Sequence, residues 1–148
     1  VFCDHALCFI QEQEKVVKEL VRVLKKGHPL IISGQNRYVL SLSLVSEDID
    51  FASKVLSKEE SFIMRKALKV YTLTPEEFKQ MLENNGVRIA KMVGKVLTMP
   101  LAISFEKLSS ENYTEEFLKK ILRIEFDLMN RVDTVSLGAH IQAIGYKR

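Results

Sequence analysis

The first part of the chain alternates short apolar runs with one amphipathic segment. Between residues 12 and 26 apolar side chains recur every three or four positions, which predicts a helix covered on one side. Gly27 and Pro29 follow this segment, and both residue types are typical of the region just past a helix end. Residues 1–4 and 30–33 are largely apolar runs that are too short for a helix, so we expect buried strands there. The pattern therefore predicts strand, helix and strand.

The remainder of the chain contains one clear helix start and several weaker signals. Thr74, Pro75 and Glu77 have the spacing of a capping box with proline at the first helical position, and Gly86 suits the end of that helix. We expect short helices within residues 37–72. Further expected elements are a continued helix over residues 62–68, a strand over 87–93, a loop and short helix over 94–108, a helix from Asn112 or Thr114 to about Asn130, and a final strand over 139–146. The residues of the long helix expected to face the core are Phe117, Ile121, Leu122, Leu128 and Met129.

Polar residues follow the first two predicted strands. Asp4 and His5 come after the first, and Gln35, Asn36 and Arg37 come after the second. A crossover through a helix makes two strands of one sheet parallel, and the carboxyl ends of neighbouring strands lie about 5 Å apart. Ligands of open parallel sheets bind outside those ends. The sequence therefore predicts that both polar groups line one crevice.

Composition narrows the classes of partner. The chain has 148 residues, 47% hydrophobic and 28% charged, as expected of one globular domain. Its net charge of +3 is small, and lysines and glutamates are interspersed, so we expect no nucleic-acid partner. No apolar run approaches the roughly 20 residues of a membrane helix, so we expect no membrane partner either.

The cysteines and histidines give no sign of a metal or a disulfide framework. Cys3 and Cys8 are the only cysteines, too few for a four-ligand zinc site, and we expect reduced thiols in a cytoplasmic protein. The three histidines, His5, His28 and His140, lack the four-residue spacing of a helical metal site. We therefore expect no metal centre.

Three segments carry a resemblance to a known family. They are residues 4–10 (DHALCFI), residues 22–27 (RVLKKG) and residues 73–86, which begin LTPEEF. In this order they resemble the C-terminal half of class I S-adenosylmethionine-dependent methyltransferases, and most closely the small-molecule, type 11-like group that includes the quinone methylases. The resemblance implies a Rossmann-like, three-layer α/β fold. This chain would supply strands four to seven in the spatial order 4-5-7-6, mostly parallel with an antiparallel last strand.

The resemblance also implies a domain organisation. Residues 1–148 would be the C-terminal portion of a single methyltransferase domain, with a helical, lid-like insertion at about 37–72. The family's glycine-rich cofactor loop is missing, because no two of the six glycines are two residues apart. The chain also opens on a strand with no turn or cap before it. We therefore expect these residues to belong to a longer protein, and to be inactive and bind the cofactor weakly or not at all when alone.

Site roles follow from the same resemblance. The residues expected near the methionine end of S-adenosylmethionine are Asp4, His5 and Leu7. Those expected to face a small-molecule methyl acceptor are Gln35, Asn36, Arg37 and Tyr38. Methyl transfer from a sulfonium is an in-line displacement in which the protein mainly aligns and desolvates the reactants. The expected activity therefore needs neither a metal nor a protein nucleophile.

Each candidate has a structural interpretation beside the functional one. His5 is the candidate catalytic base, because imidazole titrates near neutral pH, but we favour a histidine hydrogen-bonded to the backbone near the strand end. Asp4 fits equally a group that orients His5 or receives the cofactor's ammonium and a cap for the following turn. Arg37 could bind an acidic acceptor, although we favour an exposed surface residue, and Tyr38 fits packing better than a site.

Two other functions remain open. One is a non-catalytic α/β interaction module that forms a homodimer through the exposed sheet edge at residues 1–4. The other is a nucleotide-dependent dehydrogenase, whose glycine-rich fingerprint would also lie upstream. Only the resemblance separates the dehydrogenase from the methyltransferase.

Overall fold

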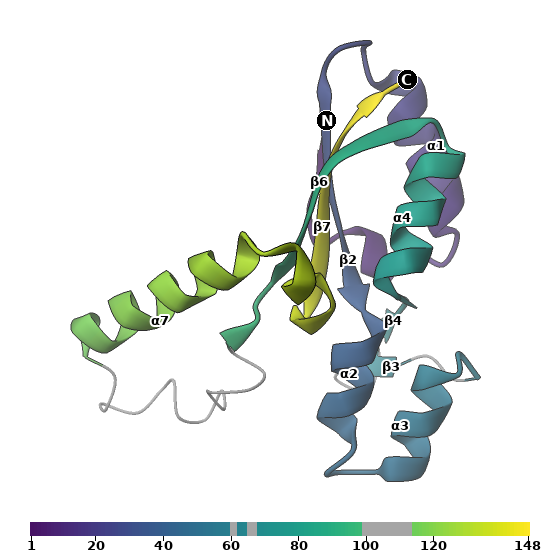
Figure 1. The fold of residues 1–148 in the computed structure, drawn as a ribbon. Coiled ribbons are helices and arrows are strands. Elements are labelled where there is room, and N and C mark those ends of the chain that lie inside the picture. The colour runs from purple at the N-terminus through teal and green to yellow at the C-terminus, as the bar shows by residue number, and fades with distance from the viewer. Residues whose placement is uncertain (60–61, 65–67, 99–113) are drawn as a thin grey trace.

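A mixed β-sheet forms the centre of the molecule. The structure is a computed structural model that describes residues 1–59, 62–64, 68–98 and 114–148. The strands of the sheet are β1 (Phe2–Cys3), β2 (Pro29–Asn36), β5 (Thr72–Leu73), β6 (Val87–Lys95) and β7 (His140–Lys147). Their order is β1-β2-β7-β6, with β5 paired to the end of β2. β1 is parallel to β2, whereas β7 is antiparallel to both β2 and β6 (Figure 1). The predicted α/β class and the predicted order with an antiparallel last strand are confirmed.

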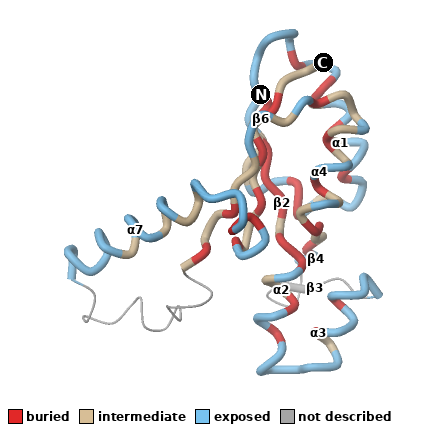
Figure 2. Tube along the Cα trace, in the orientation of Figure 1, coloured by how far each residue is buried: buried red, intermediate tan, exposed pale blue. Residues whose placement is uncertain are grey.

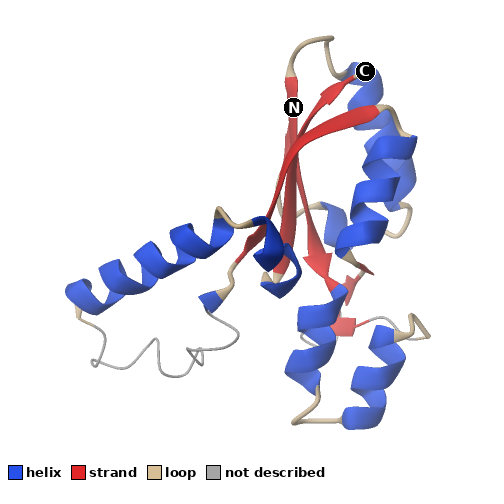
Figure 3. Ribbon diagram, viewed as in Figure 1, coloured by secondary structure: helices blue, strands red, loops and turns tan. Residues whose placement is uncertain are grey.

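Two helices cover one face of this sheet. They are α1 (Gln13–Val23) and α4 (Pro75–Asn84), and both lie on the same side in Figure 3. Phe78 and Leu82 of α4 are fully buried, as are Leu30 of β2 and Ile141 of β7. The main core is therefore the layer between this helix pair and one face of the sheet.

The ends of these helices have local causes. Thr74 and Glu77 form the predicted capping box, in which each side chain accepts a hydrogen bond from the other residue's backbone N–H. Gly27 and Gly86 have φ values of +81° and +79°, the left-handed conformation in which glycine carries no Cβ penalty. α1 ends earlier than predicted because Leu24 turns into an extended conformation, which buries its side chain in the core.

A pair of short helices follows β2 at its carboxyl end. α2 (Arg37–Leu44) and α3 (Ile49–Leu56) lie side by side below the sheet in Figure 1 and have a small core of their own. The predicted helix over residues 62–68 is wrong, because β3 (Phe62–Met64) and β4 (Leu68–Val70) form an antiparallel pair. Pairing gives these two short segments backbone partners, whereas a single helical turn is costly to nucleate.

The long helix α7 (Glu115–Met129) differs from its prediction. Thr114 caps it as expected, by accepting from the N–H of Phe117. The prediction that Phe117, Ile121, Leu122, Leu128 and Met129 face the core is wrong, because no residue of α7 is buried. Figures 1 and 2 show why: only its C-terminal end meets the sheet, through β6 and the 3-10 helix η2 (Val132–Leu137), while the rest projects outward.

The first strand is also less covered than predicted. Phe2 is 68% exposed, because β1 pairs only with β2 among the described residues and no described helix covers its outer face. Most of the loop and short helix predicted over 94–108 lies outside the described residues. No helix within the described part of the chain is long and apolar enough to span a bilayer.

Candidate functional site

Side chains from three strands meet at the carboxyl edge of the sheet. β1, β2 and β6 run in the same direction and end at this edge. β1 is parallel to β2, and β2 and β6 are both antiparallel to β7, which lies between them. Asp4, directly after β1, accepts a hydrogen bond at Oδ1 from Ser33 Oγ of β2 at 2.5 Å. Lys95 Nζ, at the end of β6, lies 2.9 Å from Oδ1 and 3.1 Å from Oδ2 of the same carboxylate. The predicted position of Asp4 at a shared edge is therefore correct.

Two histidines complete this group. The backbone N–H of His5 donates to Ser33 Oγ at 3.0 Å. The His5 ring lies edge-on to the ring of His140, with 4.0 Å between centroids and 62° between planes. His140 is the first residue of β7 and pairs with Gln35 on one side and Lys95 on the other. We call Asp4, His5, Ser33, Lys95 and His140 the carboxyl-edge cluster.

The pKa values of Asp4 and His140 are both lowered, for different reasons. Burial raises the pKa of Asp4, but hydrogen bonds from Ser33 and Lys95 outweigh it and leave that pKa below its ordinary value. Burial, followed by the charges of His5 and Lys95, lowers the pKa of His140 to about 4, although Asp4 opposes this shift. At neutral pH the cluster therefore holds an ionised carboxylate and a neutral His140 imidazole.

Backbone strain surrounds the same cluster. His5 has φ +54°, and Val96, which follows Lys95, has φ +59°. Left-handed backbone is uncommon outside glycine and a clear outlier for a β-branched residue. Such residues cost of the order of 1–3 kcal/mol each and concentrate at functional sites. Two strand ends that flank the cluster are thus held in conformations that the rest of the structure must stabilise.

Gln35 and Asn36 hold the segment that leads into β7. The Asn36 side chain is fully buried, and its Nδ2 donates to the carbonyls of Ser136 and Gly138, both at 2.8 Å. Its Oδ1 accepts from the N–H of Tyr38 at 3.0 Å, which caps α2. Gln35 Nε2 donates to the carbonyl of Ala139 at 3.1 Å. Both amides therefore fix the position of the residues immediately before His140.

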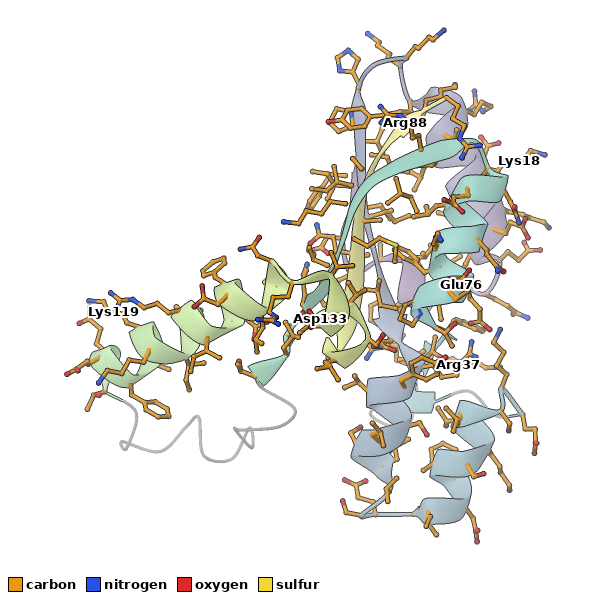
Figure 4. The ribbon with its side chains drawn as sticks, in the orientation of Figure 1. Lys18, Arg37, Glu76, Arg88, Lys119 and Asp133 are labelled. Atoms are coloured by element: carbon orange, nitrogen blue, oxygen red, sulfur yellow. The ribbon has the colours of Figure 1, made fainter. Side chains whose placement is uncertain are left out.

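Arg37 is not the exposed residue that we favoured. It is 4% exposed, and its guanidinium donates to Glu77 and to the hydroxyl and carbonyl of Thr72. Lys58, just after α3, also pairs with Glu77 at 2.5 Å. Pairing of β5 with β2 brings these distant residues together, a contact that the local sequence cannot indicate. We call Arg37, Lys58, Thr72 and Glu77 the Arg37 cluster; Figure 4 shows Arg37 where the sheet meets the α2–α3 pair.

Of the two remaining candidates, Tyr38 is exposed and Leu7 is buried. Tyr38 is 42% exposed in the first turn of α2, next to the buried Asn36. Leu7 begins the short 3-10 helix η1 (Leu7–Phe9), and its side chain is fully buried in the main core. It therefore anchors the segment that follows His5.

Comparison with known proteins bears on the fold. No family model matches the sequence, and no curated protein matches it. A solved S-adenosylmethionine-dependent methyltransferase from Thermotoga maritima is similar over 99% of this chain and 54% of its own, with 20% identity and a TM-score of 0.54. A chain from the Haloferax volcanii complex of the Trm112 methyltransferase activator and a methyltransferase is similar over 99% and 52%, with 12% identity and a TM-score of 0.51.

The fold is that of class I S-adenosylmethionine-dependent methyltransferases. The chain spans about half the length of the solved methyltransferases that it matches. Within this methyltransferase fold, β1, β2, β7 and β6 have the order predicted for strands four, five, seven and six.

Sequence reasoning missed three residues of the carboxyl-edge cluster. Lys95 is the last residue of β6, which also ends at this edge. The rule that ligands bind at the carboxyl ends of strands would have included Lys95 if the predicted strand had ended at residue 95 rather than 93. Ser33 was read only as part of a strand. His140 begins an antiparallel strand, for which that rule offers no signal, and its neighbours in space are 45 and more residues away.

The cluster offers hydrogen-bonding and proton-accepting groups rather than a metal site. Among the described residues no three His, Cys, Asp or Glu side chains gather closely enough to hold a metal ion. An ionised carboxylate, an ammonium and two imidazoles can orient a polar ligand and accept a proton from it.

Proposed function

We propose that this chain forms the acceptor-side half of an S-adenosylmethionine-dependent methyltransferase that acts on a small molecule. The observation that carries the proposal is the carboxyl-edge cluster. It lies where ligands of open α/β sheets bind, at the ends of strands that run in the same direction. Fold alone does not define an activity, so the proposal rests on this group of side chains within a methyltransferase fold.

The chemistry of Asp4 and the His5 segment supports a place for one end of the cofactor. Asp4 keeps an ionised carboxylate, which suits the ammonium of the methionine moiety, and the His5 segment lies beside it. A glycine-rich loop for the nucleoside end is absent from the 148 residues. We therefore assign Asp4, His5 and the backbone up to Leu7 to the methionine end. Bound S-adenosylmethionine supplies the electrophilic methyl carbon.

The residues at the end of β2 and the start of α2 would serve the acceptor in two different ways. Tyr38 is exposed in the first turn of α2 and can contact the acceptor directly. Gln35 is half-buried, and its side chain donates to the carbonyl of Ala139, so it would act by holding the residues before His140. Asn36 and Arg37 act indirectly, because their side chains bond to the protein itself. They fasten the α2–α3 pair, which we propose to cover the acceptor as the lid-like part of residues 37–72.

The protein's contribution to such a reaction is alignment and exclusion of water. Holding two reactants in line converts a bimolecular encounter into an effectively unimolecular step. Among the candidates, His5 is the best suited to align the acceptor. It is exposed two residues after β1, and its strained backbone is held by a hydrogen bond to Ser33.

Transfer of a labelled methyl group tests the proposal. The natural protein that contains this chain is incubated with methyl-labelled S-adenosylmethionine and a small-molecule extract from its source. We expect a labelled product, and His5→Ala should lower kcat/KM by roughly 100-fold or more, the range for a positioned acid–base group. His28→Ala is the matched control, because His28 is exposed in the turn before β2, at the opposite edge. No labelled product, or equal effects of the two variants, would contradict the proposal.

Cofactor binding by the 148 residues alone gives a second check. We expect weak binding or none, because the glycine-rich loop is absent from this sequence. Isothermal titration calorimetry with S-adenosylhomocysteine measures this directly. Tight binding by the chain alone would show that the cofactor site has been placed wrongly.

A second candidate function has one observation in its favour. β1 is an edge strand among the described residues, and its Phe2 is largely exposed. An open edge of this kind can pair with another chain, as in a non-catalytic module that dimerises. Light scattering distinguishes the two: a dimer that Phe2→Lys dissociates supports the module, whereas a monomer argues against it.

A further inference from the structure

The imidazole rings of His5 and His140 are in contact at the carboxyl edge of the sheet, and Lys95 lies beside His140. We propose that the methyl acceptor reacts through an O–H or N–H group, that His5 accepts its proton, and that His140 is the positioning residue that keeps the His5 ring in place. This inference rests on the proposed methyltransferase function. It adds the chemical class of the acceptor and a role for His140.

His140 is well placed to hold its neighbour. It lies in the sheet between β2 and β6, so its backbone is fixed from both sides. Gly138 packs so closely on the end of β6 that a Cβ there would lie 2.5 Å from the N of Lys95. Asn36 holds the carbonyls of Ser136 and Gly138, which fixes the approach to β7. Within the described part of the chain, His5 is held through its backbone and by the edge of the His140 ring.

The surrounding charges allow the pair one proton rather than two. Among the residues that the structure describes, the charged groups that face it are Asp4 from the end of β1 and Lys95 from β6, while β2 contributes the neutral Ser33 and Gln35. A second imidazolium would stand beside both the first and the Lys95 ammonium, and like charges at this distance disfavour each other. The low pKa of His140 leaves its imidazole neutral beside His5. The carboxylate of Asp4 lies close to the pair and favours positive charge there.

The proton balance of the reaction sets the acceptor class. The methyl carbon leaves the sulfonium, and the electron pair of the broken C–S bond stays on sulfur as a thioether. The acceptor oxygen or nitrogen forms the new bond to carbon, and its hydrogen passes as a proton to the imidazole of His5 and then to water. A thioether, a tertiary amine or a carboxylate has no proton to lose and would not use such a pair.

Histidine titration by NMR tests the geometry without any methyl transfer. In the natural protein labelled at histidine, the His140 resonances should stay constant from pH 8 to pH 5. Lys95→Met should move the pKa of His140 upward, and His140→Phe should leave the fold intact because it keeps a ring at that position. A His140 that titrates near 6.5 in the unmodified protein would overturn the proposed pair.

Rates and products test the chemistry. We expect His140→Ala to lower kcat at least tenfold and to shift the pH–rate profile, with His140→Phe restoring most of kcat by ring contact alone. Mass spectrometry should find the label on an O or N that carried hydrogen. Methylation of a thioether, a tertiary amine or a carboxylate, or unchanged rates in both variants, would overturn this inference while leaving the methyltransferase function standing. Absence of any labelled product would overturn both.

Discussion

Two neighbouring parallel strands end in polar pairs that look alike in the sequence but differ in the structure. Asp4 and His5 follow β1, and Asn36 and Arg37 stand at the end of β2. Asn36 and Arg37 are both buried and bond to the protein itself. His5 is exposed, has left-handed backbone and lies against a second imidazole.

The difference separates a framework from a site. Buried polar groups are normally satisfied by hydrogen bonds, and the Arg37 cluster follows this rule with one carboxylate, Glu77, shared between α2, α4 and the end of α3. The carboxyl-edge cluster instead combines strain, an exposed ring and a perturbed imidazole, which are features of functional sites. The comparison predicts large stability effects from the framework and small ones from the site.

Arg37→Met should have the largest effect on stability. It leaves Thr72 and Glu77 without their guanidinium partner, and removing one member of a buried pair costs about 3 kcal/mol. Urea unfolding measures the change. Arg22→Met is the control, because Arg22 forms an exposed pair with Glu19 that is worth less than about 1 kcal/mol. Equal effects of the two substitutions would remove the distinction between framework and surface.

Asn36→Ala should follow. It removes the cap of α2 and leaves two carbonyls before β7 without a donor, for an expected loss of about 2 kcal/mol. Asn130→Ala at the exposed end of α7 is the comparison and should cost about half as much or less. Chemical denaturation measures the free energy of unfolding of both variants. A harmless Asn36→Ala would mean that the segment before His140 is held by other contacts.

Acidification should weaken the fold in two stages. The folded pKa of His140 lies near 4, below its ordinary 6.5, so the unfolded chain binds more protons between these values and stability falls as pH drops from 6.5 to 4. Glu77 and Asp4 have lowered pKa values, so their contribution is present above the ordinary values of 4.5 and 3.8 and is lost at lower pH. Urea unfolding across this range should show both stages. His140→Phe should remove the first stage and Glu77→Gln should reduce the second.

The smallest expected effect concerns backbone strain at the site. His5→Gly and His5→Ala both remove the imidazole, but only glycine accepts φ +54° without penalty, so the glycine variant should be more stable by about 1 kcal/mol. Thermal unfolding of the two variants compares them. If alanine is the more stable, the left-handed conformation of His5 stores no strain.

The sequence predicted the elements whose causes are local. The capping box at Thr74 and Glu77 and the left-handed Gly27 and Gly86 depend on neighbouring residues, and all were correct. The burial of Arg37 could not be predicted, because Thr72 and Glu77 approach it only through the pairing of β5 with β2.

The errors in α7 and β1 have a related cause. Periodicity shows that a face is apolar but not what covers it, so α7 was formed as predicted and yet buries none of its residues. The contact of His140 with His5 spans 135 residues, and it depends on β1 and β7 flanking β2, with the end of β1 and the start of β7 at the same edge of the sheet.

The structure of the natural protein with S-adenosylhomocysteine bound tests the central claim most directly. The account predicts the thioether sulfur over the carboxyl ends of β1 and β2, on the side where His5 and His140 meet. A ligand seated at the opposite edge of the sheet, or along α7, would contradict it.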